Sequence, residues 1–126
     1  MIKGLYTVWC QASDMDRSVK FYRDVLGIEC KFASPHWSEF NLGNCNLGLH
    51  PQLENQTPPL GIYGKGWFLG IETDDIRKLH TTLTDNGVKI QGGFHDIPGG
   101  VVLDFEDPDG NTIEAYQAGI SEKDLA

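Results

Sequence analysis

The sequence predicts an α+β fold built from two consecutive βαβββ modules. Short runs of alternating apolar and polar residues indicate strands with one covered face, and each half also holds one stretch with helical spacing. The helix signals repeat, because Asp14 and Asp74 lie 60 residues apart and so do Gly27 and Gly87. A fixed offset that links the start and the stop of both helices indicates a duplicated unit.

The first module is expected over residues 1–52. A strand over residues 5–11 precedes Asp14, which is suited to cap the helix "MDRSVKFYRDVLG", and Gly27 is suited to end it. Within this helix one apolar face recurs at spacings of four, three and four, formed by Met15, Val19, Tyr22 and Leu26. Three strands should follow, over residues 28–33, 37–42 and 46–50.

The second module is expected over residues 66–117, after a linker over residues 53–65 and before a tail over residues 118–126. It repeats the order of the first: a strand "GWFLGIET", a helix "DDIRKLHTTLTDNG" and a strand "VKIQ". A Gly-rich loop, "GGFHDIPGG", should then carry His95. The last two strands, "GGVVLDFE" and "NTIEAYQ", are joined by the turn "DPDG". His36 and His80, like His95, are expected at the surface.

Composition narrows the class of protein. A chain of 126 residues has the size of one domain, and its formal charge of −8 disfavours nucleic acid and anionic membranes as partners. The start lacks a signal-peptide pattern, and no apolar run is long enough to span a bilayer. We therefore expect a cytoplasmic protein. The three cysteines are not spaced as CxxC and are expected as buried, reduced thiols.

Four stretches together resemble the vicinal oxygen chelate superfamily: "SDMDRSVKFYRDVLGIE", "FNLGNCNLGLHP", "GIETDDIRKLHTTLTDNGV" and "DFEDPDGNTIEAYQ". That superfamily includes glyoxalase I, bleomycin-resistance proteins, extradiol dioxygenases and fosfomycin-resistance enzymes, and the resemblance covers residues 5–117. It implies that the two modules form an open, cup-shaped, eight-stranded mixed sheet with helices outside. It also implies a small organic ligand in the cup and pairing into a homodimer.

The resemblance also implies four metal-ligand positions, usually His, Glu or Gln, that hold a divalent ion for chelating substrate oxygens. Carried over one at a time, these positions fall on Thr7, Gly48, Phe68 and Glu114. Only Glu114 keeps a ligand type, so no metal and no cofactor are predicted. A divalent metal at a rearranged site of Gln11, His50 and Glu114 is the alternative.

Strand alternation predicts which side chains face the helices and which line the cup. The helix-facing set is apolar and comprises Val8, Cys10, Leu47, Leu49, Leu69, Ile71, Leu103, Phe105, Ile113 and Ala115. The opposite face mixes aromatic rings with carboxylates and amides. The candidate ligand-binding residues on that face are Trp9, Gln11, Trp37, Glu39, His50, Phe68, Glu114 and Tyr116. In a second interpretation, Trp9, Phe68 and Tyr116 only fill the barrel.

Two functions follow from this face. The first is a metal-independent binding protein, similar to bleomycin-resistance members, that holds an aromatic or cationic ligand by stacking and charge. The alternative is a lyase, isomerase or dioxygenase that uses a metal at a rearranged site or uses Glu114 as a general base. Glu114 is the candidate catalytic residue in that case, because burial among rings would raise the pKa of its carboxyl.

Overall fold

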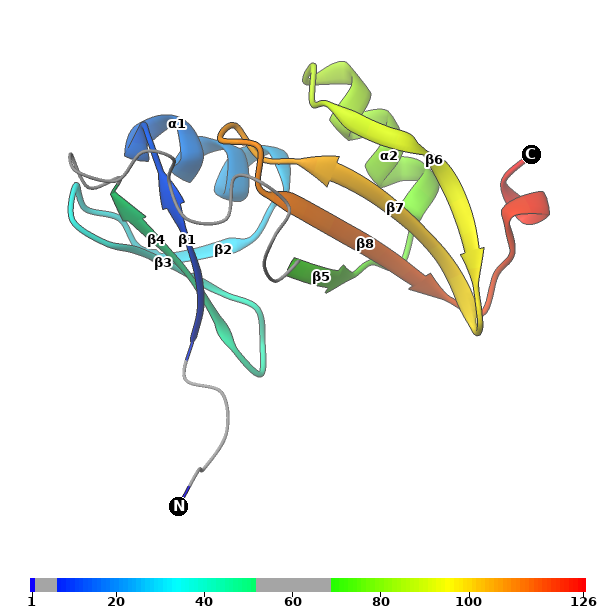
Figure 1. Cartoon of the computed structure of the whole chain (residues 1–126), viewed down its shortest axis with the longest axis horizontal. Helices are drawn as coiled ribbons and strands as arrows, with labels where there is room; N and C mark the ends of the chain where they lie inside the picture. The colour runs from blue at the N-terminus through cyan, green and yellow to red at the C-terminus, as the bar shows by residue number, and fades with distance from the viewer. Residues whose placement is uncertain (2–6, 52–68) are drawn as a thin grey trace. The chain divides into compact units, whose positions relative to one another are not determined.

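The structure is a computed structural model that describes Met1, residues 7–51 and residues 69–126 (Figure 1). The chain divides into two compact units, Met1–Gly66 and Trp67–Ala126. Each unit contains one four-stranded mixed sheet. The eight predicted strands are therefore present as two sheets of four. The predicted linker over residues 53–65 and the first three residues of the strand expected over residues 66–73, Phe68 among them, fall outside the described residues.

The first unit has the predicted βαβββ order. Its sheet runs β1-β4-β3-β2, with β1 parallel to β4 and the other neighbours antiparallel. Between β1 and β2 the chain forms α1, which continues directly into a π-helical turn, η1. The bounds are β1 Thr7–Ala12, α1 Met15–Lys20, η1 Phe21–Val25, β2 Glu29–Phe32, β3 Ser38–Asn41 and β4 Asn46–Pro51.

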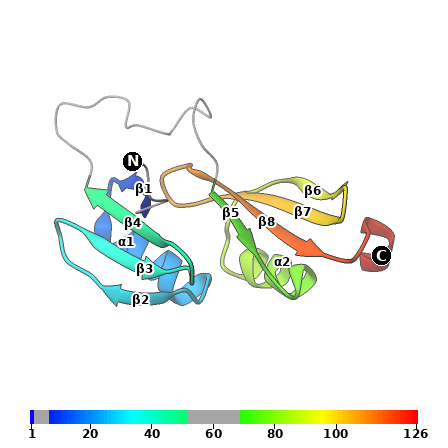
Figure 2. The same cartoon turned by 90° about the horizontal axis from the view of Figure 1, so that it is seen from below.

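The second unit repeats this topology, with its sheet in the order β5-β8-β7-β6 and β5 parallel to β8. Figure 2 shows α2 against one face of this sheet. A short 3-10 helix, η2, follows the last strand. The bounds are β5 Leu69–Glu72, α2 Ile76–Asp85, β6 Ile90–Ile97, β7 Gly100–Glu106, β8 Thr112–Ala118 and η2 Glu122–Leu125. The duplicated βαβββ unit is confirmed.

None of the helices among the described residues has the length and apolar character needed to cross a bilayer.

The helix caps confirm one prediction and correct another. Asp14 caps α1, since its carboxylate accepts the backbone N–H of Arg17 at 3.0 Å. The cap of α2 is Asp75 and not Asp74, with its carboxylate accepting the N–H of Lys78 at 2.9 Å. Gly27 and Gly87 take the positive φ expected of helix stops, at 69° and 68°.

The shift of the second cap has a physical reason in the first helix. Gly27 lies 13 residues after Asp14, whereas Gly87 lies 12 residues after Asp75. The π-helical turn η1 accounts for the difference, because a π-bulge accommodates one extra residue within an α-helix. The true offset between the two caps is therefore 61, while the two stops keep the offset of 60.

The predicted Gly-rich loop around His95 is wrong. These residues extend β6 to Ile97, and His95 pairs with Val102 of β7. The register shifts between Gln91 and His95, so that three residues of β6 oppose Leu103. Gly92, at a φ of 72°, lets the strand bulge instead of ending it.

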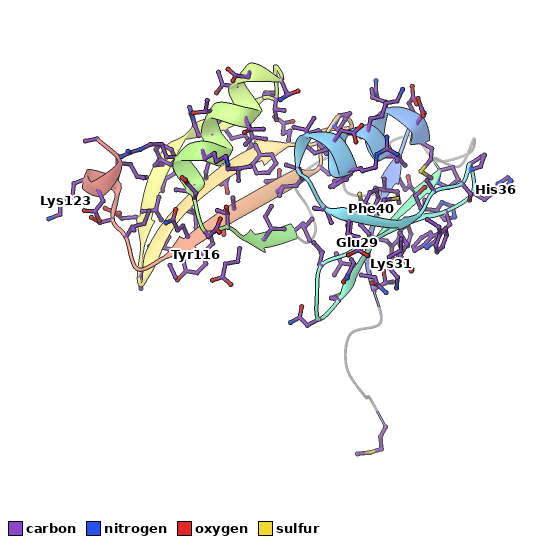
Figure 3. All side chains as sticks on the ribbon, turned by 180° about the vertical axis from the view of Figure 1, so that it is seen from behind. Glu29, Lys31, His36, Phe40, Tyr116 and Lys123 are labelled. Carbon is purple, nitrogen blue, oxygen red and sulfur yellow. The ribbon has the colours of Figure 1, made fainter. Side chains whose placement is uncertain are left out.

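Both sheets bury the predicted apolar face beneath their helices. The fully buried members of that face are Leu47, Leu49, Leu103, Phe105, Ile113 and Ala115, while Val8, Cys10, Leu69 and Ile71 are half-buried. In the first unit Tyr22 of η1 lies over Phe40, with ring centroids 5.8 Å apart, and Figure 3 shows Phe40 on the helix side of its sheet. Burying one such side chain stabilises the fold by about 1.5–3 kcal/mol. The three cysteines form no disulfide and are half-buried rather than fully buried.

The "DPDG" turn between β7 and β8 is held by one buried carboxylate. Asp107 Oδ1 accepts the backbone N–H groups of Asp109 and Asn111 at 2.9 and 2.8 Å, and its Oδ2 accepts the Asn111 amide at 2.8 Å. Asp107 is only 5% exposed. The side chain thus reinforces a backbone turn, in which the N–H of Gly110 donates to the Asp107 carbonyl at 3.0 Å, at the end of the hairpin that carries Glu114.

Asp107→Ala is expected to lower the free energy of unfolding by about 2 kcal/mol or more, because it leaves three donors without their charged acceptor. Urea unfolding followed by circular dichroism measures the loss. Asp85→Ala, at an exposed position late in α2, is the matched control and should stay within about 0.5 kcal/mol of the parent. Equal effects of both substitutions would contradict this role for Asp107.

Candidate binding site

The face of the first sheet opposite the helix is centred on Gly48. Strand register places Trp9 of β1 on one side of Gly48 and Glu39 of β3 on the other. His50 lies two residues further along β4, beside Gln11. Because successive side chains alternate across a sheet, these residues share one face.

Trp37 lies on the backbone at Gly48. A Cβ built on Gly48 would overlap the six-membered ring of Trp37, so only glycine leaves room for this ring. The indole is also fixed in orientation, because its Nε1 donates to Glu39 Oε1 at 3.3 Å. The position that the resemblance assigns to a metal ligand is therefore covered by an aromatic ring.

Three rings gather around Gly48. The ring centroids of Trp9 and Trp37 are 6.4 Å apart, those of Trp9 and His50 5.7 Å, and those of Trp37 and His50 6.3 Å. All three pairs are tilted by 51–71°, so no ring lies flat on another. Trp9 keeps 48% of its surface exposed. We call the three rings and Gly48 the aromatic face.

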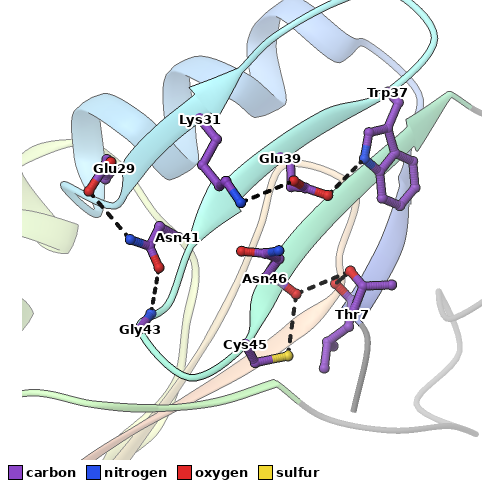
Figure 4. A network of polar contacts seen from close by, with 10 residues as sticks. Thr7, Glu29, Lys31, Trp37, Glu39, Asn41, Gly43, Cys45 and Asn46 are labelled. Atoms are coloured by element: carbon purple, nitrogen blue, oxygen red, sulfur yellow. Dashed lines mark hydrogen bonds and ion pairs between the residues drawn. The ribbon is translucent and has the colours of Figure 1, made fainter.

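The charge of Glu39 is already matched. Glu39 Oε2 lies 3.6 Å from Lys31 Nζ, while Oε1 accepts from Trp37 (Figure 4). Its side chain is only 15% exposed, against 43% for Lys31. Glu39 thus holds Trp37 in place and does not offer a free negative charge to a ligand.

His50 has its ring orientation set by the backbone. Its Nδ1 lies 2.7 Å from the carbonyl oxygen of Pro51. A carbonyl oxygen only accepts hydrogen bonds, so Nδ1 carries the proton in this contact. Gln11, opposite His50 in the register, is 4% exposed and therefore offers little surface to a ligand.

The second sheet carries a pair of carboxyl groups on its face opposite α2. Glu114 of β8 is paired in the register with Asp104 of β7, and Gly70 of β5 lies on its other side. Burial raises the pKa of the Glu114 carboxyl, and the adjacent Asp104 carboxyl raises it further by hydrogen bonding and by charge. Among the described residues, Asp104 Oδ1 is buried without a hydrogen-bond partner.

Tyr116 lies on the same face and points away from α2 (Figure 3). Its hydroxyl donates to the carbonyl of Gly99 at 3.2 Å, and its ring lies against Gly100, where a Cβ would collide with it. Glu72, its neighbour on β5, is exposed. Tyr116 therefore packs within the second sheet.

A family model described as the glyoxalase/bleomycin resistance protein/dioxygenase superfamily matches residues 6–115. The chain belongs to this superfamily. It is 27% identical to the metallothiol transferase FosB of Staphylococcus haemolyticus over 124 residues, which cover 98% of this chain and 89% of the transferase.

Two solved structures share the fold of this superfamily member. Lactoylglutathione lyase from Agrobacterium tumefaciens has a TM-score of 0.71 and 24% identity, covering 93% of this chain and 95% of its own. TnmS3, an antibiotic binding protein from Streptomyces, has a TM-score of 0.72 and 24% identity, covering 94% and 98%. At these identities the likeness concerns the fold alone.

The residues of this superfamily member do not fit the metal that the family implies. The Thr7 hydroxyl donates to the Asn46 carbonyl at 3.1 Å, Gly48 lies beneath Trp37, and Glu114 adjoins Asp104. Phe68 lies outside the described residues. Within the described parts of the chain, no three His, Cys, Asp or Glu side chains gather as a metal site would need. The rearranged set of Gln11, His50 and Glu114 draws on both units and stays a prediction.

Sequence reasoning missed Lys31 as a contributor to the open face of the first sheet, and on the second sheet it missed the pairing of Asp104 with Glu114. Lys31 pairs with Glu39 because a bulge in β2 between Cys30 and Phe32 changes which side chains meet β3. A bulge of this kind leaves no clear mark in the alternation. Asp104, in contrast, had a usable signal, since the short turn at Asp107 places "LDFE" and "TIEA" opposite each other in a hairpin.

Gly48→Ala is expected to lower the free energy of unfolding by about 1–3 kcal/mol, because its methyl group displaces the Trp37 ring. Gly70→Ala is the matched control. Gly70 also sits mid-strand, has no atom within 4 Å of an added Cβ, and should tolerate alanine without loss. Chemical unfolding measures the loss in both variants. The same measurement on the Trp37→Ala variant and on the Trp37→Ala/Gly48→Ala double variant gives the coupling free energy between positions 37 and 48. A Gly48→Ala cost that persists without the Trp37 ring would contradict the packing argument.

Glu114→Gln is expected to stabilise the fold at pH 7. The folded pKa of Glu114 is raised, so its ionisation costs stability as pH rises through that pKa, and glutamine avoids the cost. The advantage should disappear near pH 3, below the ordinary glutamate pKa of ~4.3. Urea unfolding at both pH values tests this, with the exposed Glu72→Gln as control. An advantage of equal size at both pH values would be incompatible with the raised pKa.

Proposed function

We propose that this superfamily member binds a planar aromatic ligand on the aromatic face and uses no metal ion to do so. The observation that carries the proposal is the Trp37 ring over Gly48. It takes the place of a coordinating side chain and presents a π-surface there. The ligand would be held by stacking and apolar contact, with few fixed polar groups, as is usual in small-molecule sites.

The geometry of the three rings supports stacking. Trp9 is half exposed and tilted by 58° from Trp37, so part of its surface remains open to a partner. Aromatic pairs gain about 0.5–1.5 kcal/mol beyond the apolar area they bury. The likeness in fold to an antibiotic binding protein is consistent with a binding role, although it concerns the fold alone.

A cationic ligand is less well supported than an aromatic one. Glu39, the carboxylate beside the rings, is paired with Lys31 and accepts from Trp37. A ligand cation would have to compete with Lys31 for this charge. Stacking is therefore the main source of affinity in the proposal.

A metal-dependent or general-base enzyme is the second candidate, and two observations favour it. The chain aligns with a metallothiol transferase over 98% of its length, and Glu114 keeps the one remaining ligand type. The raised pKa of Glu114 would also suit proton abstraction near neutral pH.

Elemental analysis of the purified protein separates the two candidates. The proposal expects less than stoichiometric divalent metal, and it expects binding of an aromatic probe such as 2-naphthol that survives treatment with a chelator. A stoichiometric metal that is lost on Glu114→Gln would overturn the metal-free proposal.

Trp9→Ala should weaken 2-naphthol binding about tenfold or more, because it removes the most exposed ring of the aromatic face. Isothermal titration calorimetry measures the change. Ile97→Ala, which shortens an exposed apolar side chain of the second unit, is the control and should leave the affinity unchanged. Equal affinities for the parent and both variants would place the ligand elsewhere. The homodimer and the cytoplasmic location stay predictions, and light scattering measures the first.

A further inference from the structure

We infer that the aromatic ligand carries a hydrogen-bond donor at the edge of its ring, a phenolic O–H or a ring N–H, which His50 Nε2 accepts. This inference rests on the proposed function and names the chemical class of its ligand. It follows from the tautomer of His50, from the position of its ring, and from the way the neighbouring polar groups are already used.

The contact between His50 and the Pro51 carbonyl fixes the tautomer of the imidazole. His50 Nδ1 donates to the Pro51 carbonyl at 2.7 Å, so this nitrogen holds the proton of the neutral ring. In a neutral imidazole the other nitrogen then has a lone pair and no proton. Nε2 of His50 is thus an acceptor whose direction is fixed by a backbone contact at the opposite edge of the ring.

Nε2 has no protein donor among the residues that the structure describes. The contacts of His50 there are the Pro51 carbonyl and the rings of Trp9 and Trp37. Leaving an acceptor unpaired when a ligand covers it costs free energy, whereas a ligand donor avoids that cost. The arrangement therefore selects for a ring that brings a donor.

The other polar groups near the rings do not favour a ligand with a hydrogen-bond donor in the same way. Trp37 Nε1 already donates to Glu39, and Glu39 is also paired with Lys31. Trp9 is 48% exposed, so water can accept the hydrogen bond of its indole N–H. Anionic groups are disfavoured, because they would bring negative charge to the lone pair of Nε2 in a chain with a net charge of −8.

A matched pair of probes tests the inference. 2-Naphthol and 2-methoxynaphthalene have the same planar ring, but only the first has an O–H donor. Calorimetry with the parent protein should show 2-naphthol binding about threefold to tenfold more tightly than the ether, the range expected for one hydrogen bond. His50→Phe keeps an aromatic ring and removes the acceptor, so the ratio should fall to about one.

His50→Gln is the second variant, since its amide oxygen can accept near the position of Nε2 and should restore part of the preference. Thermal unfolding of both variants shows whether they fold, and the preference in the Gln variant keeps the test decisive if the Phe variant does not.

The failure of this inference differs from that of the proposed function. If both probes bind equally to the parent, or if His50→Phe keeps the preference, the donor inference is overturned and aromatic binding stands. If neither probe binds at millimolar concentration, the proposed function is overturned and the inference with it. Loss of a dimer on Trp9→Ala, without binding of either probe, would assign the aromatic face to a second copy of the chain and overturn both.

Discussion

The open face of the first sheet depends on the contact between the Trp37 ring and the bare backbone at Gly48. A glycine in the central strand lets an indole lie on the sheet, and Glu39 and Lys31 hold that indole in orientation. Once the ring is there, no side chain at position 48 fits without displacing it. The same contact brings Trp9 and His50 into one cluster, so that a position suited to coordination becomes a surface suited to stacking.

The second sheet is constrained by a pair of adjacent carboxyl groups. Asp104 and Glu114 are directly opposed, and one Asp104 oxygen among the described residues is buried without a donor. Burial raises the pKa of the Glu114 carboxyl and the adjacent Asp104 carboxyl raises it further, so that ionising Glu114 costs stability as the pH rises. Such a cost persists only where the surrounding hairpin is firmly held, and the buried Asp107 turn provides that support.

The two modules are copies in topology and different in chemistry. Both have a parallel pair at one edge and a glycine with positive φ after the helix. The first has an extra residue in its π-helical turn and an aromatic open face, whereas the second has an α-helix with a later cap and an acidic open face. Duplication thus supplied the scaffold, and substitutions on the open faces gave each sheet its own character.

The sequence by itself determined the class of fold, the order of elements and the helix-facing residues, because these depend on local period and on turn chemistry. It also identified Thr7 and Gly48 as positions without a coordinating side chain. Tertiary structure decided that Trp37 covers Gly48, that Lys31 neutralises Glu39, that His95 lies in a strand, and that Glu114 adjoins Asp104. These contacts depend on bulges and on cross-strand register. One extra residue in a strand changes which side chains meet across the sheet. The local alternation of apolar and polar residues does not show where such an extra residue lies.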